Sequence, residues 1–152
     1  MTYAEAVEGA LIWGWIDGQK QKHDETAFRQ RFSQRSARSI WSKINRDKVT
    51  ALQKAGKLQP PGQAEVDRAK KDGRWDQAYD SPRTAEVPED LANALKANKK
   101  AAAFFAQIDG ANRYAILWRV QTAKKPETRQ ARIELFVAML ARGETIHPRK
   151  KQ

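Results

Sequence analysis

The stretch "FSQRSARSIWSKINRDKV", Phe32–Val49, contains the change of period that decides the fold class. Up to Phe32 the pattern has a period of two, since Phe28 and Phe32 alternate with arginines in "FRQRF". That alternation is typical of a half-buried strand. From Ile40 to Ala55 the apolar residues recur at the three- and four-residue spacing of a helix. A strand followed directly by a helix predicts an α+β fold.

The residues upstream predict a helix and a β-hairpin. Thr2 and Glu5 have the spacing of a capping box, which places a helix over Tyr3–Trp13. Gly14 is expected to end that helix. Trp15–Lys22 is the expected partner of the Phe28 strand, with a turn between them at Asp24 and Glu25.

An isolated two-stranded hairpin is at best marginally stable in water. Three arrangements would support it. The N-terminal helix covers it, its edge pairs with another chain, or the natural protein has strands before Met1.

The helix expected over Ile40–Ala55 has one apolar face, with an amide on it. On a helical wheel the apolar face groups Trp41, Ile44, Val49, Leu52 and Ala55. Asn45 falls on the same face. Gly56 is expected to cap the helix, and Pro60-Pro61 to break the chain after it.

The remaining sequence predicts a polar helix, a loop and a helical C-terminal part. The polar helix covers Gly62–Gly73, and the loop Gly73–Pro88 has turn residues without a clear period. Trp75 and Tyr79 are expected to anchor this loop. We therefore predict an α+β part over 1–80 and a helical part with a basic tail over 81–152.

The helical part contains one ambiguous segment. "YAILWRV", Tyr114–Val120, has helical spacing but is also compatible with a buried strand. Pro126 is expected to open the last helix and Gly143 to end it. The predicted fold is thus predominantly helical α+β.

Composition favours a soluble, basic protein. The 152 residues include 29 Lys and Arg against 18 Asp and Glu, a formal net charge of +11. Such a charge suits a nucleic acid or an acidic protein surface, and also a solvated surface without a ligand. Cysteine is absent, which excludes disulfides and thiolate chemistry. No apolar run approaches the ~20 residues of a membrane span. The N-terminus lacks the basic start of a signal peptide, so the expected location is cytoplasmic.

The stretch around Trp41 is the candidate ligand site. If Ser39 is the N-cap of the tryptophan-bearing helix, the first helical amides point outward and the helix dipole adds positive charge. Nearby arginines and hydroxyls would complete a site for phosphate, sulfate or carboxylate. The candidate anion-binding residues are Arg35, Arg38, Ser39, Ser42 and Asn45. Alternatively, the helix is simply capped and the arginines pair with Asp17, Asp24 or the N-terminal helix.

Other polar and aromatic residues have structural readings. Asn45 is expected to bind backbone groups of Trp75–Asp80, because a buried unpaired amide costs roughly 1–3 kcal/mol. Asp17 is expected to pair with an arginine. The residues expected to line a pocket or to be structural are Trp15, Asp17, Trp41, Trp75 and Tyr79.

Catalysis and metal binding have little support in the sequence. His23 and His147 are the only histidines and lack companions at metal-ligand spacing. No catalytic constellation is present, so no catalytic residue, metal or cofactor is expected. An enzyme site near Asp17, Asn45 and Trp75 is the least favoured hypothesis.

A nucleic-acid interface is the alternative function. The C-terminal helices carry basic residues that would share one face of a helical hairpin. These residues are Arg113, Arg119, Lys124, Lys125, Arg129 and Arg132. Tyr114 and Trp118 could stack on bases, although their spacing is also that of core residues.

Four ordered segments resemble a known family. They are "YAEAVEGALIWGWIDG", "FSQRSARSIWSKINR", "GRWDQAYDSP" and "RYAILWRVQTAKKPETRQARI". Together they are similar to the YdeI/OmpD-associated family, also called the bacteriocin-protection or OmdA-like family, from about Tyr3 to Gly143. The chain departs from the usual family pattern in two places. It lacks the N-terminal segment that members usually carry, and Gln34 stands where a proline is usual.

The resemblance implies a fold and a general role. It implies an α+β N-terminal part, a helical C-terminal part, and a link to bacteriocin or antimicrobial-peptide tolerance and to stress. It supplies no catalytic residues. We therefore expect a non-catalytic bacterial protein that binds an anionic ligand or an acidic protein partner. Nucleic-acid binding is the alternative, and a homodimer through the hairpin edge is a further expectation.

Overall fold

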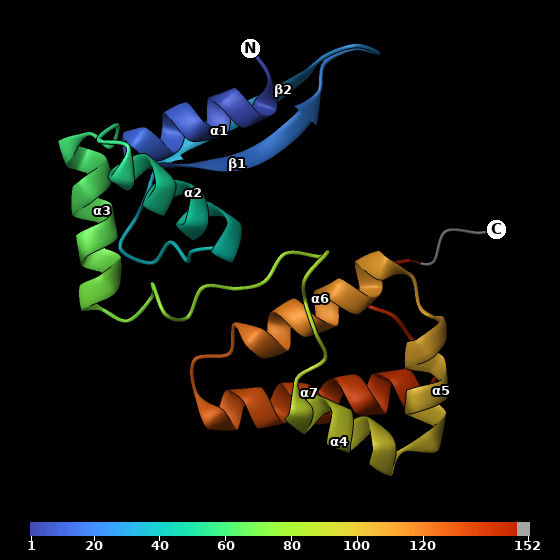
Figure 1. Cartoon of the computed structure of the whole chain (residues 1–152). Coiled ribbons are helices and arrows are strands. Elements are labelled where there is room, and N and C mark those ends of the chain that lie inside the picture. Colours follow the sequence, from blue (N-terminus) through green and yellow to red (C-terminus); the bar gives the residue numbers. More distant parts are fainter. Residues whose placement is uncertain (149–152) are drawn as a thin grey trace. The chain divides into compact units, whose positions relative to one another are not determined.

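The computed structural model describes residues 1–148 and divides the chain into two compact units (Figure 1), Met1–Ala78 and Tyr79–Gln152. Residues 1–148 form seven helices and one two-stranded antiparallel sheet. The predominantly helical α+β fold class is therefore confirmed. Of the predicted basic tail, residues 147–152, the part 149–152 lies outside the described residues.

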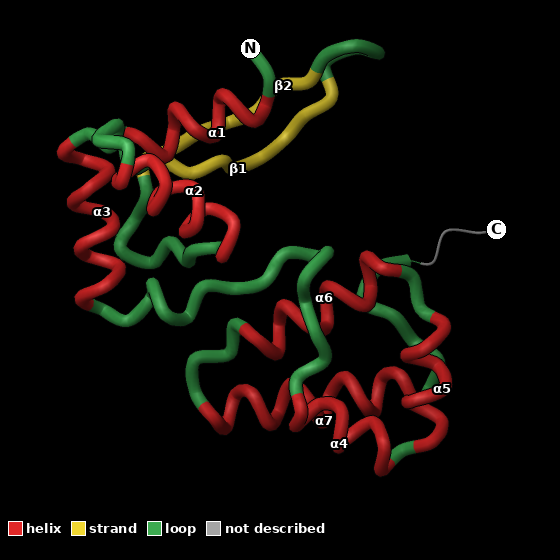
Figure 2. The backbone as a smooth tube through the Cα atoms, viewed as in Figure 1, coloured by secondary structure: helices red, strands yellow, loops and turns green. Residues whose placement is uncertain are grey.

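Unit 1 contains the sheet. Both strands of the described chain precede α2 (Figure 2). Its elements are α1 (Tyr3–Ile12), β1 (Trp15–Lys22), β2 (Phe28–Gln34), α2 (Lys43–Lys54) and α3 (Pro60–Lys71). The predicted capping box is present, because the Thr2 side chain accepts from the Glu5 amide and the Glu5 side chain accepts from the Thr2 amide. Gly14 ends the helix region with a φ of 74°, a left-handed conformation that favours glycine.

The hairpin is supported by α1, which packs against β1. This is the first of the three arrangements expected for it. The strands pair from Trp15 with Gln34 to Lys22 with Phe28. The prediction that Asp17 pairs with an arginine was wrong. Its carboxylate accepts a 2.7 Å hydrogen bond from the Tyr3 hydroxyl, which ties α1 to β1.

The core of unit 1 lies on the face of α1 that carries Val7 and Leu11. Its buried apolar residues are Val7, Leu11, Trp41, Val49, Leu52, Val66, Ala69 and Ala78. The prediction that Ile44 and Ala55 share the Trp41 face was wrong, since both are exposed. The reason is that α2 begins only at Lys43, after its N-cap Ser42. Trp41 therefore precedes the helix and enters the core from an extended segment.

The start of α3 lies in close contact with the end of α1. Pro60 and Pro61 are the first residues of α3, where a missing amide hydrogen is tolerated, and do not simply break the chain. A Cβ on Gly62 would lie 2.3 Å from the Ile12 carbonyl oxygen and 2.9 Å from Leu58 Cδ1. The Gln59 amide also donates to the Ile12 carbonyl, at 3.1 Å. Only glycine allows this approach.

Unit 2 is built from α4 (Glu89–Ala97), α5 (Lys99–Gln107), α6 (Gly110–Gln121) and α7 (Pro126–Ala141). The segment Tyr114–Val120 lies within α6, so the helical alternative is correct and the strand alternative is wrong. The core is a single cluster to which all four helices contribute. Its buried members are Leu91, Leu95, Ala101, Phe105, Ile108, Ile116, Leu117, Val120, Ile133, Phe136 and Leu140. Among the described residues, no helix is both long and apolar enough to cross a bilayer.

Substitution of Gly62 with alanine is expected to destabilise unit 1. The added methyl group would overlap the Ile12 carbonyl, so we expect the free energy of unfolding to fall by about 1–3 kcal/mol. Gly9→Ala is the matched control, since a Cβ at this position of α1 meets nothing within 4 Å. That variant should gain about 0.5–1 kcal/mol from helix propensity. Urea unfolding followed by tryptophan fluorescence measures the free energy of unfolding of both variants. Equal changes in the two variants would contradict the packing argument.

Candidate functional site

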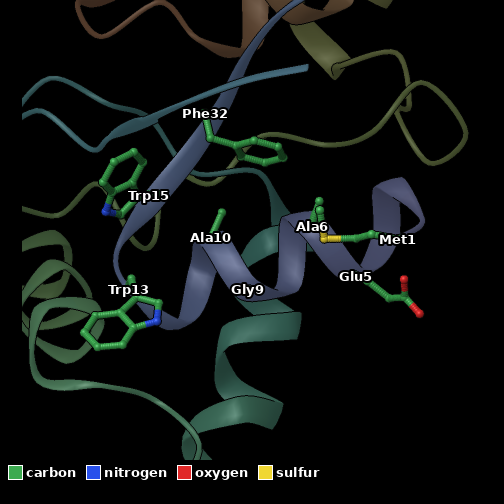
Figure 3. Close-up of a pocket in the computed structure, with 8 residues that line it drawn as sticks. All are labelled: Met1, Glu5, Ala6, Gly9, Ala10, Trp13, Trp15 and Phe32. Atoms are coloured by element: carbon green, nitrogen blue, oxygen red, sulfur yellow. The ribbon is translucent and has the colours of Figure 1, made fainter. Parts of the chain in front are cut away.

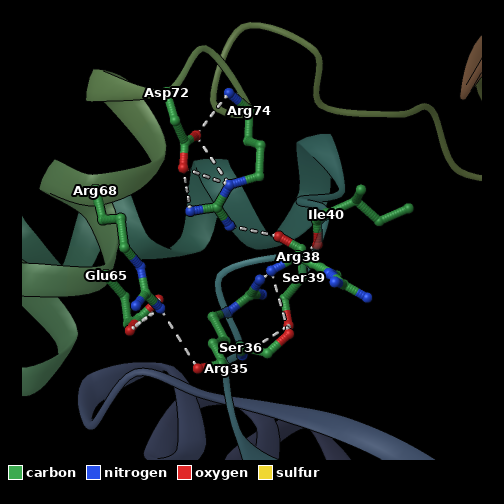
Figure 4. Close-up of polar contacts among 9 residues, drawn as sticks. All are labelled: Arg35, Ser36, Arg38, Ser39, Ile40, Glu65, Arg68, Asp72 and Arg74. Atoms are coloured by element: carbon green, nitrogen blue, oxygen red, sulfur yellow. Dashed lines mark hydrogen bonds and ion pairs between the residues drawn. The ribbon is translucent and has the colours of Figure 1, made fainter. Parts of the chain in front are cut away.

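The segment between β2 and α2 is held from inside by a buried arginine. Arg35 is only 3% exposed, and its guanidinium carbon lies 3.6 Å from the centroid of the Trp41 ring. Its Nη1 donates to the Ile40 carbonyl at 3.3 Å (Figure 4). The guanidinium therefore covers the indole face and satisfies a carbonyl of the same segment. It is directed into the unit and not toward solvent.

Two arginines outside this segment also bind its backbone (Figure 4). Arg74, 6% exposed, donates from Nη1 to the Ser39 carbonyl at 2.6 Å and pairs through Nη2 with Asp72 at 2.7 Å. The side-chain hydrogen bond from Arg74 lowers the pKa of Asp72 below its ordinary value. Arg68 donates to the Arg35 carbonyl at 3.5 Å. These side-chain bonds supplement the few backbone hydrogen bonds of an irregular segment, such as the bond from the Arg35 amide to the Gly14 carbonyl at 3.1 Å.

The structure separates the predicted anion-binding residues into three environments. Arg35 is buried, as described above. Ser39 is not the N-cap, which corrects the prediction, because its Oγ accepts from the Ser36 amide at 3.0 Å within a turn. Ser42 caps α2 by accepting from the Asn45 amide at 3.1 Å. Arg38 is exposed on the turn. Anion binding by this set stays a prediction, with Arg38 as its exposed cation.

The polar contact expected from Asn45 is made by its neighbour. Arg46 donates from Nη1 to the Trp75 carbonyl at 3.4 Å, which is the contact to the 75–80 loop that was assigned to Asn45. The Trp75 ring packs edge-on against Trp41, with centroids 5.2 Å apart. Trp75 therefore anchors its loop within unit 1, as expected. Tyr79 packs edge-on against Trp118 at 6.2 Å in unit 2.

Four of the six residues predicted to contact nucleic acid have interaction partners inside unit 2. Arg129 donates to the Val120 carbonyl at 2.9 Å, and Arg132 donates to the Arg119 carbonyl. Arg119 donates to the Ala115 carbonyl at 3.0 Å, and the Arg113 guanidinium lies 4.8 Å from the Phe105 ring centroid. The bonds from Arg129 and Arg132 reach carbonyls in the last turn of α6, where the carbonyls of a helix lack a full set of amide partners. Nucleic-acid binding by the set, including Lys124 and Lys125, stays a prediction.

A groove along α1 was not among the predicted sites. It has a volume of about 510 Å³ and lies between α1 and the hairpin (Figure 3). The lining residues are Met1, Glu5, Ala6, Gly9, Ala10, Trp13, Trp15 and Phe32. Trp13 and Trp15 are 53% and 43% exposed, which is unusual for such large apolar side chains. Of these residues, only Trp15 had been expected to line a pocket.

The floor of the groove explains why it is open. Ala6, Gly9 and Ala10 recur at helical spacing and present almost no side chain toward the hairpin (Figure 3). The larger side chains of α1, Val7 and Leu11, point into the core. A second face of small residues on α1 was therefore the sequence signal for the groove. Within residues 1–148, no group of three or more His, Asp or Glu side chains is arranged to hold a metal ion.

Replacing Arg35 with lysine is expected to destabilise unit 1. An ammonium group cannot cover the Trp41 face with a plane and bind the Ile40 carbonyl in the same geometry. We expect a loss of about 1–2 kcal/mol, the range of a desolvated cation–π contact. Arg38→Lys on the exposed turn is the control and should stay within about 0.5 kcal/mol of wild type. Urea unfolding measures both, and similar losses for the two variants would show that the stack is not important.

The Asp90–Arg129 pair is expected to make the stability of unit 2 depend on pH. The Arg129 side chain bonds both oxygens of Asp90, at 2.5 and 2.9 Å, and lowers the pKa of Asp90. The carboxylate therefore stabilises the folded state above the ordinary aspartate pKa, and this contribution is lost as the pH falls through the lowered pKa. Because both groups are partly exposed, we expect Asp90→Asn to cost about 0.5 kcal/mol at neutral pH. When unfolding is measured from neutral to acidic pH, the free energies of unfolding of wild type and Asp90→Asn should converge. A constant difference would exclude this linkage.

Comparisons with known proteins give two family matches and no individual relatives. Residues 1–65, within unit 1, match the model of a family described as "Domain of unknown function (DUF8412)". The searches of curated proteins and of solved structures each returned no match. Residues 84–143, within unit 2, match the family described as "Bacteriocin-protection, YdeI or OmpD-Associated". The resemblance seen in the sequence is thus confirmed over residues 84–143, whereas the N-terminal segments assigned to the same family match a different model.

Proposed function

We propose that this protein contributes to bacteriocin protection without catalysis, by binding a partner in the groove between α1 and the hairpin. The family match of residues 84–143 supports the role. The observation that carries the binding mode is the groove itself, with its apolar walls open to solvent. An exposed apolar groove of this kind typically receives a ligand or a protein segment.

Gly9 supports the proposal independently of the aromatic walls. A glycine inside a helix costs about 0.5–1 kcal/mol relative to alanine. Packing within the chain does not require it, since a Cβ at Gly9 would meet nothing within 4 Å. A residue that weakens its helix without relieving an internal clash leaves room for the close approach of another backbone. Gly62 is the opposite case, where the chain itself fills the space.

Binding of an anionic ligand or an acidic protein is the second candidate. The formal net charge of +11 supports it, as does the exposed Arg38 beside the start of α2. Its test is a phosphate titration followed by NMR. Shifts confined to the amides of residues 36–43 would support this candidate, and their absence would remove it.

Filling the groove is expected to abolish protection without unfolding the protein. In Gly9→Leu the side chain would occupy the floor of the groove, and the stronger helix former should keep α1 intact. The assay is survival of bacteria that produce wild-type or variant protein during exposure to a bacteriocin. Ala4→Leu, on an exposed position of α1 outside the groove, is the control and should protect like wild type. Full protection by folded Gly9→Leu would refute the groove as the functional site.

A further inference from the structure

We propose that the exposed face of the β-hairpin binds duplex DNA in the major groove. This is a further activity, separate from the groove along α1 and from the basic residues of unit 2. Three features of the hairpin support it. They are two arginines that do not act inside the fold, the narrow two-stranded form of the sheet, and a glycine that neither packing nor backbone conformation requires.

The two faces of the hairpin have different surroundings. Phe28 and Phe32 point toward α1, since the Phe28 and Tyr3 ring centroids are 6.3 Å apart and Phe32 lines the groove along α1. Side chains alternate along a strand, so Arg29 and Arg31 leave the opposite face. Both arginines are exposed. The helix therefore covers the phenylalanine side of the hairpin and leaves the arginine side open.

The open side carries hydrogen-bond donors close together. Gln21 lies directly opposite Arg29 in the strand register, so their side chains share a face. Arg31 follows about 7 Å along the same strand. A Cβ on Gly18 would lie 4.0 Å from the Cβ of Arg31. We call the surface formed by Gly18, Gln21, Arg29 and Arg31 the arginine face.

The two guanidinium groups of the arginine face remain available to a partner. Among residues 1–148, no hydrogen bond or ion pair joins either group to another side chain or carbonyl. The carboxylates of the hairpin are engaged or lie at its turn. Asp17 accepts from the Tyr3 hydroxyl on the side of α1, and Asp24 accepts from the amides of Thr26 and Ala27. Arg29 and Arg31 thus differ from the arginines that bind carbonyls inside each unit.

The hairpin has the dimensions of a ribbon that enters a DNA groove. In the described chain no third strand flanks either edge of the sheet. Paired strands lie about 4.8 Å apart, and the major groove of B-DNA is about 12 Å wide and admits a two-stranded ribbon. Figure 1 shows the turn end of the hairpin extending beyond the start of α1. All residues of that turn, 23–27, are exposed.

The side chains of the arginine face suit base edges better than a protein surface. In the major groove, arginine donates two hydrogen bonds to guanine O6 and N7, and glutamine bonds adenine N6 and N7. A stable protein interface instead has aromatic or other apolar anchors at its centre. The arginine face contains only arginine, glutamine and glycine. Duplex RNA fits poorly, because side chains cannot reach into its deep and narrow major groove.

Gly18 supports a close approach at this face. A glycine weakens a strand, since it has no side chain to pack. Its φ is not positive, although it lies at the register shift between Asp17 and Lys20. A Cβ here would come no nearer than 3.6 Å to any atom, which is ordinary van der Waals contact. The fold therefore tolerates a side chain at this position, and its absence leaves room beside Arg31 for a base pair.

Binding of labelled DNA duplexes tests the proposal. Duplexes that wild-type protein retains from a random-sequence pool are measured by fluorescence polarisation. Each is compared with the same duplex containing deazaguanine, in which carbon replaces N7 while the phosphates are unchanged. We expect deazaguanine to weaken binding roughly three- to tenfold. The double variant Arg29→Gln with Arg31→Gln should bind the selected DNA roughly tenfold more weakly or less, and duplex RNA of the same sequence should also bind more weakly than DNA.

Variants elsewhere separate the site from total charge and from folding. Lys124→Gln with Lys125→Gln removes the same charge from exposed residues of unit 2 and should bind DNA like wild type. Gly9→Leu changes α1 on the other side of the sheet and should also bind DNA like wild type, so this activity and the proposed function of the groove are tested independently. Gly18→Val should keep the hairpin stable, because valine favours strands, and yet weaken DNA binding. Circular dichroism should show the same secondary structure in all variants.

Every other outcome overturns a defined claim. If wild type retains no duplex DNA, or if the arginine variant binds like wild type, the proposal fails. A loss confined to the lysine variant would place DNA on unit 2, and a loss in Gly9→Leu would place it at the groove. If the arginine variant binds weakly but deazaguanine has no effect, the arginine face contacts phosphates and does not read the major groove. Full binding by Gly18→Val would refute the close approach beside Arg31. Preference for polyglutamate over DNA, lost in the arginine variant, would make an acidic protein the partner.

Discussion

The architecture of unit 1 depends on α1 supporting a hairpin that cannot stabilise itself. Two strands expose both faces and both edges, and the burial gained between them is small. The helix α1 packs on β1 and is tied to it by the Tyr3–Asp17 hydrogen bond, while Val7 and Leu11 anchor its other face in the core. A single helix of ten residues therefore contacts two different surfaces. Its sequence must be apolar on one face and small on the other.

That double use of α1 produces the groove. If its outer face carried leucines, the helix would fill the space beneath Trp15 and Phe32. With alanine and glycine there, the aromatic side chains of the hairpin have no complete cover, and Trp15 stays 43% exposed. The close contact at Gly62 holds the end of α1 against α3. The groove is thus a direct consequence of how the helix is fixed on its opposite side.

Many arginines of this basic chain act inside the fold. Arg35 and Arg74 bind carbonyls around Ser39–Ile40, and Arg129 and Arg132 bind carbonyls near the end of α6. The guanidinium group suits this task, since it donates several hydrogen bonds in a plane and stays charged at any physiological pH. A formal net charge of +11 consequently overstates the positive charge that a partner would meet.

Local patterns in the sequence determined the elements of this protein. The capping box at Thr2, the alternation at Phe28–Phe32 and the proline that opens α7 placed helices and strands correctly, because these signals act over a few residues. Only tertiary structure decided where α2 begins, since Ser39 and Ser42 are equally good caps and packing of Trp41 selects the second. It also turned Arg35 inward onto that indole, and gave Asp17 a tyrosine partner. Such choices depend on how the elements pack against one another, and the periodicity of a single element carries no information about that packing.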